Sequence, residues 1–216
     1  MPSRIMPFVD GEYYHILNRG IAQMPIFTRY RDHQRFIKTM LYYQIEDPKP
    51  RFSFFSPSTK LINSTKKIIY FVCYCLMPNH FHFLLQQVRE GGITEFISKL
   101  SNSYTKYFNT KYKRNGPIFQ GEFKAVHIET NEQLVHLSRY IHLNPLVGYI
   151  VKSLESYDFS SFKEYLGATN KNLCHKEIVL SQFKSVDEYK KFVYDQEDYG
   201  KQLEVIKHQL IDYPQV

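Results

Sequence analysis

The sequence lacks the features of membrane-bound and disulfide-stapled proteins. No apolar run approaches the roughly 20 residues that a membrane-spanning helix needs, so we expect no membrane contact. No N-terminal secretory signal is visible either. The three cysteines, Cys73, Cys75 and Cys174, are odd in number, and two of them lie too close on one strand face for an ordinary disulfide framework. These absences predict a reduced, cytoplasmic protein.

The chain also lacks a glycine-rich loop that could cradle a nucleotide phosphate, so we expect no ATP site. It has no internal repeat and no low-complexity tract. With 216 residues, 43% of them apolar, it is long enough to bury a core and is not composed like a disordered protein. We expect one domain over 1–150, followed by an extension over 151–216 to which the sequence assigns no role.

Positive charge and aromatic rings are what the chain has in excess. Its formal net charge is +7, its pI is about 9.1, and aromatic residues make up 16% of it without a single tryptophan. A basic surface favours a polyanionic partner such as nucleic acid, and exposed rings can stack on bases. A Phe-rich core is the commoner reason for such a composition.

Hydrophobic periodicity predicts the element order β-α-β-β-α-β-α. The first six elements fit an antiparallel sheet with two helices on one face, which is a ferredoxin-like α+β fold. We expect Pro145 to stop the last helix of this core, and we expect a polar helix over 185–210. The predicted strands cover 12–18, 67–76, 80–87 and 123–129, and the predicted helices cover 31–43, 93–108 and 131–144.

Two histidines, His80 and His82, flank one phenylalanine inside the second strand of the predicted hairpin. Because strand side chains alternate between faces, both imidazoles point to one side while Phe81 and Phe83 point to the other. Two imidazoles on one strand face form half of a metal site. An isolated pair of this kind is usually just solvent-facing, so the interpretation depends on what other residues join it.

Tyr140 and Asn144 lie four residues apart on the predicted helix 131–144 and therefore project from one of its faces. The tyrosine lies off the apolar stripe that would anchor this helix to the sheet. That stripe consists of Leu134, Leu137 and Ile141. An Asn144 amide oxygen with two imidazoles and waters would suit Mn²⁺ or Mg²⁺. Zinc is the competing ion, although no cysteine or carboxylate pattern nearby suggests a closed tetrahedral site. Asn144 is about equally consistent with a helix C-cap.

Four segments in order resemble the blocks of IS200/IS605-like single-tyrosine (HUH) transposases, in the branch associated with repetitive extragenic palindromes. They are 14–20 (YHILNRG), 77–85 (MPNHFHFLL), 119–125 (FQGEFKA) and 137–145 (LSRYIHLNP). The resemblance covers about residues 8 to 166. It implies a transposase-like DNA nickase and strand transferase in which one tyrosine attacks single-stranded, hairpin-bearing DNA. That attack leaves a 5′-phosphotyrosine link and a free 3′-OH.

By position in these blocks, the resemblance assigns Tyr140 as the nucleophile. It assigns His80 and His82 as the metal-binding pair and Asn144 as the third ligand of Mg²⁺ or Mn²⁺. Some relatives are dimers in which the tyrosine helix serves the partner's metal site, while the palindrome-associated branch is compatible with a monomer. Both a monomer and a homodimer are therefore open.

The remaining candidates have plainer interpretations. Tyr104 is a second candidate nucleophile, but Leu100 and Phe108 place it on an apolar helix face, which favours the core. We expect His15, His127, His136 and His142 to be structural or exposed. Six basic residues are expected either to bind single-stranded DNA or simply to be solvated: Arg19, Lys106, Lys111, Lys113, Arg114 and Lys124. Two other functions stay open, a DNA-binding protein without turnover and a metal-dependent phosphodiesterase that uses water.

Overall fold

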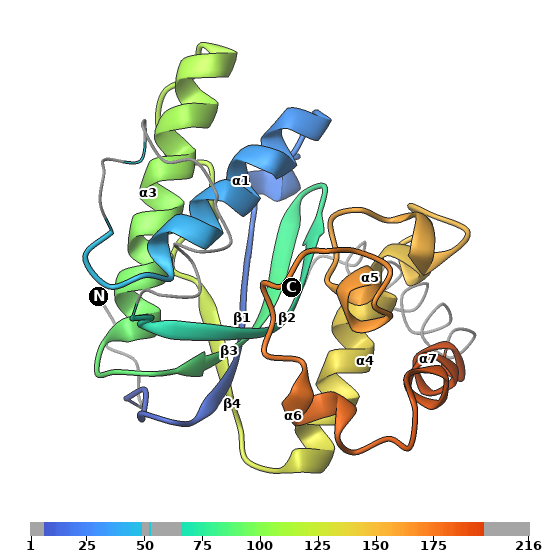
Figure 1. Ribbon diagram of the computed structural model, residues 1–216. Helices are drawn as coiled ribbons and strands as arrows, with labels where there is room; N and C mark the ends of the chain where they lie inside the picture. The colour runs from blue at the N-terminus through green and yellow to red at the C-terminus, as the bar shows by residue number, and fades with distance from the viewer. Residues whose placement is uncertain (1–6, 49–51, 53–65, 197–216) are drawn as a thin grey trace, which may run out of the picture.

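The protein is built on a four-stranded antiparallel sheet with the strand order β2-β3-β1-β4 (Figure 1). The computed structural model describes residues 7–48, 52 and 66–196. The predicted ferredoxin-like α+β arrangement is confirmed, because the sheet strands and two helices alternate in the expected order. The strands are β1 (Tyr13–Arg19), β2 (Ile69–Met77), β3 (His80–Gln87) and β4 (Lys124–Ile128).

Helices α1 (Tyr30–Tyr43) and α3 (Gly92–Tyr112) cover one face of the sheet (Figure 1). Their apolar side chains pack on the alternate residues of β3 that point to this side. The Phe36 ring lies 5.5 Å from the Phe81 ring, and the Phe96 ring lies 6.4 Å from the Phe83 ring. Burying these phenylalanines forces their strand neighbours, the two histidines, onto the opposite face.

Helix α4 (Asn131–Val147) packs on that opposite face, mainly against β2 (Figure 1). The Thr130 hydroxyl caps its first turn by accepting a hydrogen bond from the Gln133 amide at 3.1 Å. The expectation that Pro145 ends this helix is wrong, because α4 continues to Val147 and the Gly148 amide still donates to the Asn144 carbonyl at 2.8 Å. A proline in the last turn removes one hydrogen bond, and the burial of Pro145 itself offsets that loss.

Residues after 150 fold back over α4 and the outer edge of β2. The Leu76 amide donates to the Phe159 carbonyl at 2.9 Å, and the His175 amide donates to the Phe71 carbonyl at 2.7 Å. These bonds cover an edge strand that would otherwise be exposed. The short elements are η1 (Ile21–Gln23), η3 (Leu154–Ser156), α5 (Phe162–Tyr165), α6 (Glu177–Leu180) and α7 (Val186–Tyr194).

Helix α7 is the described part of the polar helix predicted over 185–210, and residues 197–210 lie outside the described residues. Buried side chains from 151–196 belong to the same apolar core as the sheet, Leu154 and Tyr189 among them. The division of the chain at residue 150 stays a prediction.

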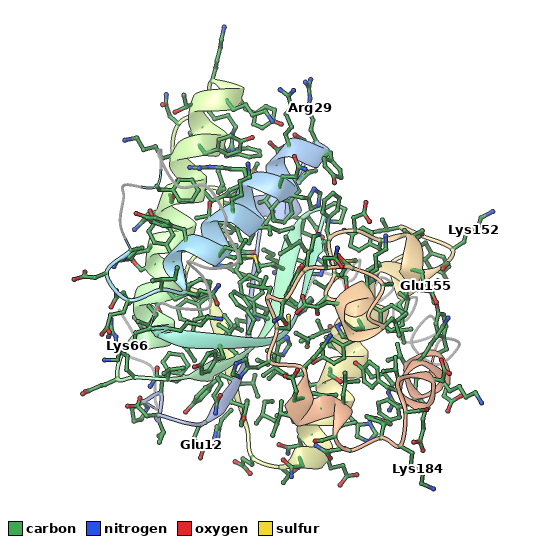
Figure 2. All side chains as sticks on the ribbon, viewed as in Figure 1. Glu12, Arg29, Lys66, Lys152, Glu155 and Lys184 are labelled. Atoms are coloured by element: carbon green, nitrogen blue, oxygen red, sulfur yellow. The ribbon has the colours of Figure 1, made fainter. Side chains whose placement is uncertain are left out.

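Several charged side chains lie at the surface of the protein, and the cysteines lie in its core. Charged side chains such as Arg29, Lys152 and Lys184 project from the periphery (Figure 2). All three cysteines are buried free thiols. In the part of the chain that the structure describes, no helix combines the length and apolar character needed to cross a bilayer.

A buried carboxylate links helices α1 and α3, which cover the same face of the sheet. Asp32, in the first turn of α1, has no exposed surface. Its oxygens accept hydrogen bonds from the Thr28 and Arg29 amides, the Thr28, Tyr107 and Tyr112 hydroxyls, and the Lys111 ammonium at 2.5 Å. Burial alone would raise the pKa of Asp32, but these hydrogen bonds outweigh burial and hold the pKa well below its usual range.

We expect Asp32→Asn to lower the free energy of unfolding by about 3 kcal/mol at pH 7, because it leaves the Lys111 charge without its buried partner. Urea denaturation measures the change. The folded-state pKa of Asp32 is depressed, so its stabilisation is fully present above the ordinary aspartate pKa and is lost as the pH falls below it. The difference between wild type and variant should therefore shrink below a pH of about 4.

The matched control is Asp187→Asn, a substitution at an exposed position in α7. It should change the free energy of unfolding by less than about 0.5 kcal/mol. Equal effects of the two variants at pH 7 would refute the structural role assigned to Asp32.

Candidate functional site

The candidate site lies on the face of the sheet that α4 partly covers. His80 and His82 project together from β3, with their ring centroids 4.9 Å apart and their planes perpendicular. His82 is only 4% exposed, whereas His80, beside the hairpin turn, is half-buried. The strand alternation predicted from the sequence therefore holds, and one imidazole is fixed in the interior while the other reaches the rim.

Each imidazole has a polar partner on its Nδ1 atom. The Asn79 Oδ1 atom lies 2.6 Å from Nδ1 of His80, and the His15 Nε2 atom lies 3.0 Å from Nδ1 of His82. His15 comes from β1, where its neighbour Leu17 pairs with His82 across the strands. Burial lowers the pKa of His15 to about 4, so this ring is neutral at physiological pH.

Tyr140, on α4, lies beside His82 and His15. Its ring centroid is 5.4 Å from that of His82 and 6.2 Å from that of His15, in both cases edge to face. The side chain is nevertheless 42% exposed. Tyr140 therefore combines proximity to the histidines with access for a large substrate, unlike its neighbour Ile141, which is fully buried.

Asn144 lies one helical turn after Tyr140 and is half-buried. Its Nδ2 atom donates a hydrogen bond to the Tyr140 carbonyl at 2.7 Å. The C-cap interpretation does not hold, because Gly148 is the C-cap residue and Asn144 lies inside the helix. With its amino group bound to the backbone, Asn144 has its Oδ1 atom to offer a cation.

The donor chemistry of this site fits a divalent metal ion. Imidazole nitrogens whose other ring nitrogen is held by a polar partner are the usual arrangement of metal-ligating histidines. Among the described residues, no group of three or more His, Cys, Asp or Glu is placed to hold a metal. An ion at His80 and His82 would therefore need ligands of another kind, such as an amide oxygen, a phosphate or water.

The structure separates the six basic residues into two groups. Arg19 and Lys124 are exposed and project from β1 and β4 on the histidine side, since Arg19 pairs with His80 and Lys124 pairs with Leu17 in the sheet register. The other four lie in the C-terminal half of α3 or just after it, and α3 covers the opposite face (Figure 1): Lys106, Lys111, Lys113 and Arg114. Lys111 is already engaged by Asp32.

Tyr104, the second candidate nucleophile, belongs to the core as expected. It has no exposed surface, and its hydroxyl donates to the Ile26 carbonyl at 2.6 Å. Burial raises its pKa further above the ordinary tyrosine value. His136 is exposed beside Arg139, and its Nδ1 atom lies 2.6 Å from that guanidinium.

A chain of buried polar side chains links α4 to the residues after 150. The Tyr189 hydroxyl of α7 lies 2.8 Å from Nδ1 of His142 and 3.1 Å from the Ser138 hydroxyl. The Nε2 atom of His142 lies 2.7 Å from the Ser161 hydroxyl. Burial lowers the pKa of His142 to about 3, so this residue is a neutral link between α4 and the extension.

Sequence reasoning did not find the contacts of His15 and Asn79 with the two strand histidines. The sequence predicts His15 to be structural or exposed, and the structure adds its contact with His82. Strand alternation could have given the face of β1 on which His15 lies, but not the register of β1 against β3, because these strands are distant in the chain. Asn79 precedes β3, and only the position of the His80 ring reveals its contact with that ring.

The chain is similar to known proteins over the segment that contains the candidate site. Residues 59–144 match the family described as "Transposase IS200 like", and this segment contains both histidines, Tyr140 and Asn144. Over these residues the chain is similar to IS200-like transposases, and the resemblance predicted from the sequence is confirmed. No curated protein matches the chain.

One solved structure that matches is described as "Structure of the REP associates tyrosine transposase bound to a REP hairpin". The TM-score is 0.54 at 15% sequence identity, and the match covers 80% of this chain and 90% of that chain. At this identity the match shows a shared fold.

We expect Tyr189→Phe to lower the free energy of unfolding by about 1–2 kcal/mol, because the variant loses the hydroxyl that links Ser138 to His142 in a buried site. Hydrogen exchange should also become faster in the amides of 134–144. Urea denaturation and exchange measured by mass spectrometry test the two effects. Tyr30→Phe, at a residue that is 56% exposed, is the control and should change neither. Unchanged exchange in α4 of the Tyr189 variant would contradict its role.

Proposed function

We propose that this protein is a single-tyrosine DNA nickase and strand transferase that acts on single-stranded, hairpin-bearing DNA with a divalent metal ion. The observation that carries this proposal is the approach of the exposed Tyr140 to His82, one of the two strand histidines, within one chain. The IS200-like match over the same residues supports the reaction class. The hairpin partner is inferred by analogy from the described relative, whose structure contains a REP hairpin.

The proposed step exchanges one phosphoester for another. The Tyr140 oxygen attacks the scissile phosphorus, an oxygen–phosphorus bond to Tyr140 forms, and the bond from phosphorus to the 3′-oxygen breaks. The tyrosine proton ends on the departing oxygen, directly or through water, which gives a free 3′-OH. Because the bond energy is kept in the phosphotyrosine, a 3′-OH can reverse the step on a new strand without ATP.

His80 and His82 would hold Mg²⁺ or Mn²⁺, with Asn144 Oδ1 as a third ligand. Bound there, the ion would offset negative charge at the scissile phosphate. A phenol is largely protonated and a weak nucleophile at neutral pH, so orientation by α4 matters. The hydrogen bond from the Asn144 side chain to the Tyr140 carbonyl ties the two residues together on one turn.

The basic residues have different parts in this proposal. Arg19 and Lys124 flank the histidine face, where they would contact the phosphates next to the cleaved one. Lys106 on α3, with Lys113 and Arg114 just after this helix, would contact DNA outside the reacting strand. Lys111 would contribute less, because its charge is already paired with Asp32.

We also propose that Tyr140 acts on the histidines of its own chain, so that a monomer suffices. Helix α4 is held by its own sheet and, through Tyr189 and Ser161, by its own extension. Exchange of α4 with a partner would have to break this buried polar chain, which opposes a swapped dimer.

Tyr140→Phe should abolish covalent capture of a hairpin-bearing single strand in Mn²⁺, because no oxygen is left to attack the phosphorus. The measurement is an adduct that survives denaturing gel electrophoresis. Tyr149→Phe is the matched control, since Tyr149 is 67% exposed and lies just after α4, and it should form the adduct at the wild-type level.

An adduct in Tyr140→Phe would show that another residue is the nucleophile. Cleavage without any covalent species in the wild type would favour the phosphodiesterase that uses water. Salt-sensitive hairpin binding with neither adduct nor cleavage would favour the DNA-binding protein without turnover.

Mixing two inactive variants tests whether the site is formed within one chain. Tyr140→Phe keeps the histidines and His80→Ala keeps the tyrosine, so a swapped dimer would restore one complete site per mixed pair. We expect the mixture to form no adduct above the sum of the separate variants. Restoration toward a quarter or more of wild-type adduct would establish a site shared between chains.

A further inference from the structure

Both histidines of the candidate site are held at the same ring atom. The contacts at Nδ1 come from different parts of the fold, Asn79 in the hairpin turn and His15 in the neighbouring strand β1. A hydrogen bond at one ring nitrogen decides which nitrogen carries the proton and which presents a lone pair. The two partners therefore help to decide which ring nitrogen of each histidine can bind a ligand.

The sense of the His80 contact follows from the orientation of Asn79. The Asn79 Nδ2 atom lies 3.4 Å from the Gln23 carbonyl, which can only accept, so the Oδ1 atom is the end that faces His80. A carboxamide oxygen accepts and never donates. At 2.6 Å from that oxygen, Nδ1 of His80 must carry the proton, which leaves the lone pair of the neutral ring on Nε2.

His82 meets a partner that could act in either sense. A nitrogen–nitrogen contact of 3.0 Å needs one proton between His82 Nδ1 and His15 Nε2. If the proton belongs to His82, its Nε2 atom carries the lone pair, as in His80. If it belongs to His15, the proton of neutral His82 lies on Nε2, which then cannot bind a metal.

We propose that His15 and Asn79 are positioning residues that accept hydrogen bonds from Nδ1 of His82 and His80 and so present both Nε2 atoms to a divalent cation. This inference rests on the proposed metal site. It assigns the two rings the same tautomer. Two imidazoles on one strand face need the same tautomer in order to bind a shared ligand.

The surrounding fold suits such a role. His15 is half-buried and stacks on His82, with ring centroids 5.2 Å apart and planes 22° apart. The Asn79 segment is fixed because its own carbonyl accepts from the Gly20 amide at 2.7 Å. Rigid supporting groups of this kind hold ligands within the small errors that a metal site tolerates.

The first test reads the tautomers directly in the full-length, metal-free protein at pH 8. Two-bond nitrogen–proton spectra of labelled histidine rings distinguish a proton on Nδ1 from a proton on Nε2, and His80→Ala and His82→Ala assign the signals. We expect both rings to carry the proton on Nδ1. A proton on Nε2 of His82 would overturn the role of His15, and the same result for His80 would overturn that of Asn79.

The second test measures Mn²⁺ affinity by titration calorimetry. His15→Leu and Asn79→Ala should each weaken binding by about 10- to 100-fold, the usual effect of losing a partner of a ligating histidine. His15→Gln and Asn79→Asp keep an acceptor oxygen and should recover most of the affinity. His136→Leu, at the exposed histidine of α4, is the control and should bind as the wild type does.

These outcomes separate this inference from the proposed function. Wild-type protein that binds no Mn²⁺ would remove the proposed metal site, while the ring spectra would still decide how His80 and His82 are held. Normal Mn²⁺ affinity in His15→Leu and Asn79→Ala would overturn the positioning role even if the protein forms a DNA adduct. Where the leucine or alanine variant fails to fold, the acceptor-keeping variants and the wild-type spectra still give the answer.

Discussion

The contact between α4 and the histidine face of the sheet is the constraint on which the candidate site depends. The tyrosine and the histidines come from elements that are distant in the chain. Only this packing brings the ring centroid of Tyr140 to 5.4 Å from that of His82. Phenylalanines fill the opposite face of β3, so the histidines have only one side on which to project. The core on one side of the sheet thus determines the chemistry available on the other.

The same contact is held by polar groups as well as by apolar area. One buried chain of hydrogen-bonded side chains holds it, and each member has a partner. Its members are His142, Tyr189, Ser138 and Ser161. Such chains have a demanding geometry, because a shifted helix would leave several buried groups unpaired. A register shift of α4 along β2 would therefore be opposed by more than the loss of apolar contacts. In this way the residues after 150 take part in placing Tyr140 without touching it.

The sequence predicts the local geometry well and the long-range geometry poorly. The two-residue strand period correctly places His80 and His82 on one face, and the helical period correctly separates Tyr140 from the buried stripe. The continuation of α4 through Pro145 was not predictable, because it depends on burial of the last turn. The contact of His15 with His82 depends on strand register, and the separation of Arg19 from the α3 lysines depends on which face each element covers.

The unequal burial of the site residues has a consequence for how such a site would work. His82 is 4% exposed and held by two strands, whereas Tyr140 is 42% exposed on a helix that packs mainly at one edge of the sheet. The histidine half is therefore the more buried half, and the tyrosine is the half that a substrate can reach. A phosphate bound at the histidines would be fixed first, and small rotations of the tyrosine would then complete the alignment for in-line attack. Precision in this arrangement has to come from the strand side, where His15 and Asn79 lie.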